Sequence, residues 1–92
     1  MIKILNITQS GTLPKMWTIE VLGQKRDDIL ILKDLFDDHY ANSGLFCKKI
    51  IFNTGFPSFS EIGAKVLIKD QTNFKAEDCK NYILKVLNIL IS

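Results

Sequence analysis

Hydrophobic and polar residues alternate in two segments near the start of the chain. In residues 16–22, Trp17, Ile19 and Val21 would point to one side of a strand and the residues between them to the other. Residues 2–8 are a second segment of strand type, and a glycine and a proline mark the turn between the two. Strands with one dry and one wet face are typical of an antiparallel sheet that is covered on one side.

The spacing of apolar residues changes to three and four positions after residue 26. Asp27 and Asp28 can cap a helix and suit its positive end. The apolar stripe that follows consists of Ile29, Leu32, Leu35, Phe36 and Tyr40. Gly44 can adopt the left-handed conformation beyond the helix end. Residues 29–32 alone would also fit a strand paired with residues 16–22, but the continuation of the stripe favours a helix.

The second half of the chain repeats this order of elements. Residues 46–53 and 64–69 are the third and fourth predicted strands, and a second helix begins near residue 75. Its apolar stripe consists of Cys79, Tyr82, Ile83, Val86, Leu87 and Leu90. The sequence therefore predicts a single α+β domain, residues 1–92. It would be a two-layer sandwich in ββαββα order, with a four-stranded, mainly antiparallel sheet and both helices on one face.

Composition is that of an ordinary globular domain. The 92 residues are 47% hydrophobic and 24% charged, which excludes extensive disorder and leaves no room for a second domain. The most apolar stretch, residues 82–91, has about half the length that a membrane-spanning helix needs. The amino-terminal residues lack the long apolar run of a signal peptide. We therefore expect a soluble, cytoplasmic protein without a membrane partner.

Side chains able to perform chemistry are few and scattered. His39 is the only histidine, and Cys47 and Cys79 are far apart, so no zinc-type spacing occurs. We expect both cysteines to be buried thiols rather than a disulfide or a nucleophile, and His39 to be a solvated residue at a helix end. Each glycine stands alone, so no phosphate-binding loop is present. The pattern indicates neither an enzyme, a metal site nor a cofactor.

Three groups of residues remain as candidate partner-binding sites. They are Asp34, Asp37 and Asp38 on the first helix, Phe56 and Phe59 in the loop 53–63, and Lys65 and Lys69 on the outer side of the fourth strand. The aspartates form an acidic helix side, and a loop phenylalanine either fills a core edge or anchors a partner. Lys48 and Lys49 would share the outer sheet face with the other two lysines. The net charge is −1 over residues 1–46 and +3 over residues 47–92.

These features favour a binding protein. In size, single-domain build and absence of motifs, the chain resembles small bacterial immunity proteins as a class. That resemblance implies a non-catalytic inhibitor that neutralises a partner protein, such as a toxin or effector, by binding it. The alternative is a nucleic-acid-binding protein that uses the lysines of the sheet face. A single arginine and the absence of an RNP-type aromatic pair argue against it. A homodimer formed through the open sheet face or the edge strands is a third option.

Overall fold

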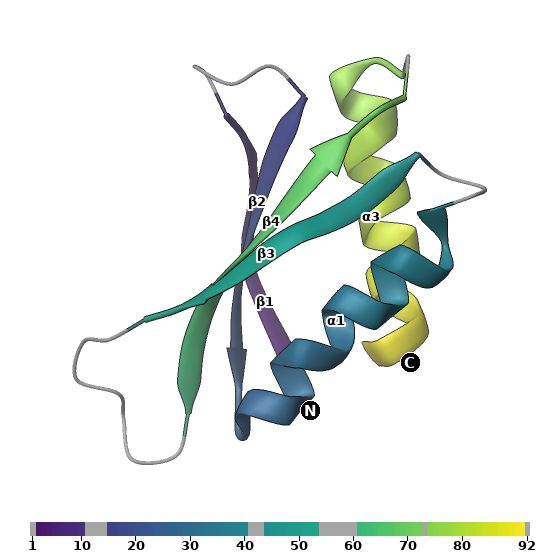
Figure 1. Cartoon of the computed structure of the whole chain (residues 1–92). Helices are drawn as coiled ribbons and strands as arrows, with labels where there is room; N and C mark the ends of the chain where they lie inside the picture. Colours follow the sequence, from purple (N-terminus) through teal and green to yellow (C-terminus); the bar gives the residue numbers. More distant parts are fainter. Residues whose placement is uncertain (1, 11–14, 41–43, 54–60, 73, 92) are drawn as a thin grey trace.

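The computed structural model confirms the predicted α+β sandwich. It describes residues 2–10, 15–40, 44–53, 61–72 and 74–91. The elements are β1 (Ile2–Gln9), β2 (Met16–Gly23), α1 (Arg26–Asp38), β3 (Leu45–Phe52), β4 (Ile62–Asp70) and α3 (Ala76–Ile91). The strands form one antiparallel sheet in the order β1-β2-β4-β3. Both helices lie on the same side of this twisted sheet (Figure 1).

The core fills the space between the sheet and the helices. Trp17, Ile19 and Val21 of β2 are buried, as predicted, and Ile19 lies opposite Val66 of β4 in the sheet register. The helices contribute Ile29, Leu32 and Phe36 from α1, and Cys79, Ile83, Val86 and Leu87 from α3. Residues 29–32 are helical, so the strand alternative for that segment is wrong. Alternation in the strands and helical spacing in α1 and α3 thus direct apolar side chains into one core.

Two details of α1 differ from the sequence-based expectation. The helix ends at Asp38, so Tyr40 lies beyond it and is 41% exposed instead of continuing the buried stripe. Asp27 and Asp28 lie in the first turn, whereas the N-cap residue is Lys25, with no side-chain capping hydrogen bond. Gly44 has a φ of +73°, which confirms the left-handed position expected after the helix. Within the residues described above, no helix is long and apolar enough to cross a membrane.

Candidate functional site

One face of the sheet carries no described helix, and we call it the uncovered face (Figure 1). The even-numbered residues of β2 and the odd-numbered residues of β4 form its centre, opposite in direction to the buried residues of the same strands. In the register, Thr18 lies beside Leu67 and Glu20 beside Lys65. The outward-pointing side chains of the two central strands are therefore not covered by a described helix and are accessible to another molecule.

A bulge in β3 adds two further lysines to this face. The pairing with β4 shifts between Cys47 and Lys49. Cys47 is buried and Ile50 packs against the core, so the two residues between them, Lys48 and Lys49, both lie on the opposite side. Both are exposed, as are Lys65 and Lys69 on the neighbouring β4. The sequence-based expectation that these four lysines share the outer sheet face is confirmed, and we call them the lysine cluster.

The charges of the molecule are divided between its two sides. With Lys3 on β1, the uncovered face carries five lysines, and Glu20 is its only carboxylate among the described strand residues. The described strand residues of this face therefore sum to +4, or to +3 with the exposed Glu61 immediately before β4, whereas the whole chain has +2. On the other side, α1 alone has five aspartates against Arg26 and Lys33. The uncovered face is thus a basic surface on a molecule of nearly balanced charge.

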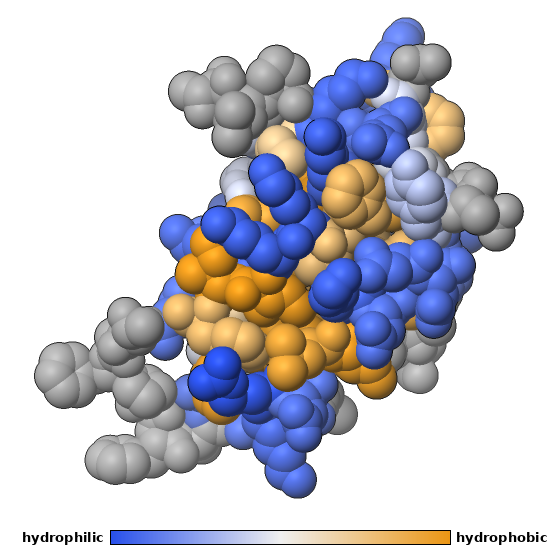
Figure 2. All heavy atoms as spheres, viewed as in Figure 1, coloured by the Kyte–Doolittle hydropathy of each residue, from blue (hydrophilic) through white to orange (hydrophobic). Residues whose placement is uncertain are grey.

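Aliphatic side chains lie between the lysines. Leu5 of β1 is 52% exposed and Ile51 of β3 is 43% exposed, while Leu22 and Leu67 are half-buried. Ile51 lies opposite Lys65 in the register. Figure 2 shows that apolar residues also continue as a band over the β3 and α1 side of the molecule, bordered by hydrophilic residues. Apolar side chains interspersed with charged ones occur on protein-binding surfaces.

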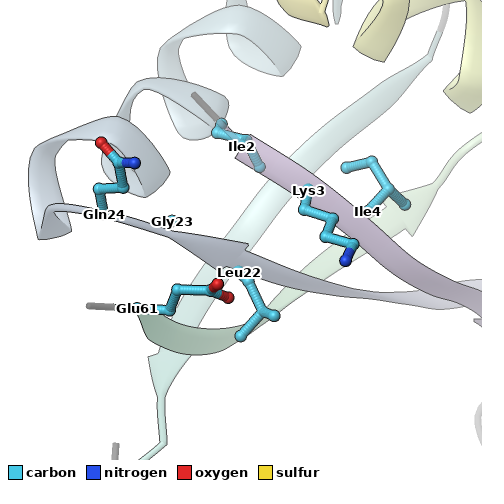
Figure 3. A pocket seen from close by; sticks show the side chains of 7 residues that line it. All are labelled: Ile2, Lys3, Ile4, Leu22, Gly23, Gln24 and Glu61. Carbon is cyan, nitrogen blue, oxygen red and sulfur yellow. The ribbon is translucent and has the colours of Figure 1, made fainter. Parts of the chain in front are cut away.

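A hollow of about 500 Å³ lies at one end of β1 and β2. It is lined by Ile2, Lys3, Ile4, Leu22, Gly23, Gln24 and Glu61. In Figure 3, Lys3, Leu22 and Glu61 lie on one side of the strands, whereas Ile2 points to the other side, where the helices lie. The hollow therefore borders the uncovered face at the end remote from Lys69. No sequence pattern indicated it, because its walls come from separate strands.

The acidic helix side is exposed but does not form a closed site. Asp34, Asp37 and Asp38 all face solvent. The ammonium group of Lys33 donates a hydrogen bond of 2.7 Å to Asp37, and this contact raises the pKa of Lys33. Asp37 also lines a hollow of about 350 Å³ with Tyr40 and Phe46. In the part of the chain that the structure describes, no group of three potential metal ligands converges. Phe56 and Phe59 lie outside the described residues.

The two cysteines and the histidine lie in different environments. Cys47 is 2% exposed and Cys79 is fully buried, and both are free thiols, as expected. His39 is the C-cap of α1, as its position predicted. However, it is half-buried rather than solvated, and its Nδ1 lies 2.9 Å from the carbonyl oxygen of Leu35. Cys47 instead faces the core, where burial raises the pKa of its thiol to about 11. A thiol of this kind is a poor nucleophile at neutral pH.

The two thiols make stability depend on pH in the alkaline range. Burial, and then the hydrogen bond with the Asp70 carboxyl group, raise the pKa of Cys79 to about 12, compared with an ordinary value of 9.0. The folded state therefore retains thiol protons that the unfolded state loses above pH 9. We expect the free energy of unfolding to fall by about 1.4 kcal/mol per pH unit for each thiol. The fall extends from pH 9 to about 11 for Cys47 and from pH 9 to about 12 for Cys79.

Urea unfolding at a series of pH values measures this dependence. The double variant Cys47→Ala/Cys79→Ala should lose the part of the slope that comes from the thiols. An unchanged slope in that variant would contradict the assignment. At pH 8 the folded protein should also resist a thiol reagent that modifies both cysteines after unfolding, because the thiolate form is scarce and the sulfur atoms are buried.

Comparisons with known proteins give no further guide to the chemistry of this surface. No protein-family model matches the chain, and no similar curated protein or solved structure is found. The functional argument therefore rests on the residues and their geometry.

Proposed function

We propose that this chain is a non-catalytic protein-binding protein of the small inhibitor or immunity type, which occupies its partner with the uncovered sheet face. The observation that carries the proposal is the composition of that face, where exposed aliphatic residues lie among five lysines. Exposed apolar groups next to charged ones support a specific contact with another protein. That the partner is a toxin or an effector is part of this proposal.

Features of the two edge strands favour binding through the uncovered face over pairing of an edge strand with another chain. β1 and β3 are the two edge strands, and each contains one irregularity, between Ile4 and Asn6 and between Cys47 and Lys49. Bulges and lysines on an edge strand oppose pairing with another chain. Face-to-face dimerisation would also bring five lysines against five others. These features support a partner that differs from the chain itself.

Capture of the partner from cells that express the protein tests this proposal. The side chain of Leu67 lies at the centre of the uncovered face, so Leu67→Gln replaces an apolar group with a neutral polar one and leaves the charge of the face unchanged. We expect this variant to retain about one-tenth or less of the amount of partner that the unaltered protein retains. A loss of this size is usual for a substitution at the centre of a protein–protein interface. Quantitative mass spectrometry, followed by titration calorimetry with the purified partner, measures the loss.

Leu84→Gln is the matched control. Leu84 is a 38% exposed leucine on α3, on the other side of the molecule. This variant should bind the partner like the unaltered protein, and circular dichroism should show that both variants are folded. Equal retention by the two variants, or loss only in Leu84→Gln, would reject the uncovered face as the binding surface. Absence of any stoichiometric partner would reject the proposed function itself.

A further inference from the structure

We infer that the partner presents a carboxylate-rich protein surface, which seats on the lysine cluster of β3 and β4. This inference rests on the proposed function and adds the chemical nature of the surface that is bound. Its basis is charge complementarity. Four of the five lysines of the uncovered face belong to the two adjacent strands β3 and β4, whereas β2 carries only Glu20. The basic character is therefore concentrated on one half of the sheet.

The bulge in β3 is the feature that produces this concentration. If strict alternation continued after the buried Cys47, Lys49 would point into the core, where an unpaired ammonium group is strongly disfavoured. The shift in pairing instead places Lys48 and Lys49 together, with Lys49 opposite Leu67. Leu67 in turn lies between Lys65 and Lys69, whose α-carbons are about 13 Å apart at the spacing of a strand. A matching partner would carry several carboxylates within a patch of this size.

The residues around the lysines favour a protein surface over a nucleic acid. Single-stranded nucleic acids stack their bases on the faces of exposed aromatic rings. The aromatic residue of the described strands on this face is Phe46, which is half-buried. Its ring packs edge-on against Tyr40, with centroids 5.6 Å apart and an interplanar angle of 78°. Lys65 lies between Glu20 and Ile51, and Lys49 lies opposite Leu67, so Phe46 is the aromatic neighbour of the lysines on the described strands. Arg26, the only arginine, lies on α1 over the ring of Phe52.

Binding of a labelled 20-residue poly-L-glutamate tests the inference by fluorescence anisotropy. Lys65→Glu/Lys69→Glu changes the net charge from +2 to −2. Lys80→Glu/Lys85→Glu makes the same change with two exposed lysines of α3. At low salt, we expect the first variant to bind at least about tenfold more weakly than the unaltered protein, and the second to stay within about threefold. Lys48→Ala should weaken binding by a smaller factor, because it removes one ammonium group and keeps the bulge.

Two further probes test whether a nucleic acid or a membrane surface binds the lysine cluster instead. They are the oligonucleotide dT20 and vesicles of phosphatidylcholine with one-quarter phosphatidylserine. Equal losses in the two charge-reversal variants would overturn the inference, because binding would then follow net charge and not the lysine cluster. Affinity for dT20 more than about tenfold above that for poly-L-glutamate at 150 mM salt would overturn it in favour of a nucleic acid. Binding at that salt to the vesicles alone would overturn it in favour of a membrane surface.

The outcome can be separated from that of the proposed function. If the poly-L-glutamate result fails but Leu67→Gln still lowers capture of a protein partner about tenfold, only the acidic character of the partner is rejected. If neither experiment gives the expected result, the uncovered face has no role in binding and both proposals fall.

Discussion

Replacing Phe36 with alanine is expected to lower the free energy of unfolding by about 3–5 kcal/mol. Phe36 is fully buried on α1, so its removal leaves a cavity between the helix and the sheet. A domain of this size has a total stability of about 5–15 kcal/mol, so the variant would be partly unfolded at moderate temperature. Urea unfolding followed by the fluorescence of Trp17 measures the change, because Trp17 is the only tryptophan and is 3% exposed.

Leu30→Ala is the control for this prediction. Leu30 lies on the same helix but is 43% exposed, so its truncation leaves no cavity. We expect a change of less than about 1 kcal/mol for this variant. If the two substitutions had similar effects, the position of α1 over the sheet would be wrong, since that position is what makes one residue buried and the other exposed.

Asp70→Ala is expected to lower the free energy of unfolding by about 2–4 kcal/mol, because it removes a buried acceptor and leaves its donors without a partner. Asp70 is 4% exposed at the end of β4. Its carboxylate accepts a hydrogen bond of 2.7 Å from the backbone N–H of Thr72 and another from the hydroxyl group of the same residue. The Thr72 hydroxyl oxygen accepts from the N–H of Phe74, so this network shapes the chain between β4 and α3.

Two other substitutions make this prediction specific. Asp70→Asn retains one acceptor oxygen and should cost less than Asp70→Ala. Asp34→Ala removes an exposed carboxylate of α1 and should change stability by less than about 0.5 kcal/mol. Chemical denaturation of the three variants gives the comparison. An Asp70→Ala protein as stable as the Asp34→Ala protein would show that the Asp70 network does not contribute to folding.

The sequence contained a signal for the bulge in β3. Lys48 and Lys49 stand side by side between Cys47 and the run Ile50–Ile51, in a segment that otherwise reads as a strand. In a regular strand, one of two adjacent lysines must share the face of the core residues. The two can lie on one side only if an extra residue is inserted in the pairing, and the structure has this shift. The expectation that both would be outside was therefore correct, but alternation alone did not explain it.

Tyr40 is a residue whose position the sequence pattern predicted wrongly. Its spacing from Phe36 is that of a helix, which is why the sequence placed it in the buried stripe. The helix ends two residues earlier, and the hydroxyl group of Tyr40 donates a hydrogen bond to the side-chain oxygen of Gln71, in the chain beyond β4. A partner 31 positions away in the sequence cannot be recognised from local spacing. The end of α1 was consequently predicted less well than its buried face.

The sequence by itself determined the type and order of the elements and the inward direction of residues such as Ile19, Val66 and Phe36. It could do so because the alternation of a strand and the spacing of a helix are local properties of the chain. Only the tertiary structure decided the strand order β1-β2-β4-β3, the register between the strands and the hollow beside Leu22. Those features depend on which distant segments pair, and pairing is selected by the packing of the whole core rather than by any one segment.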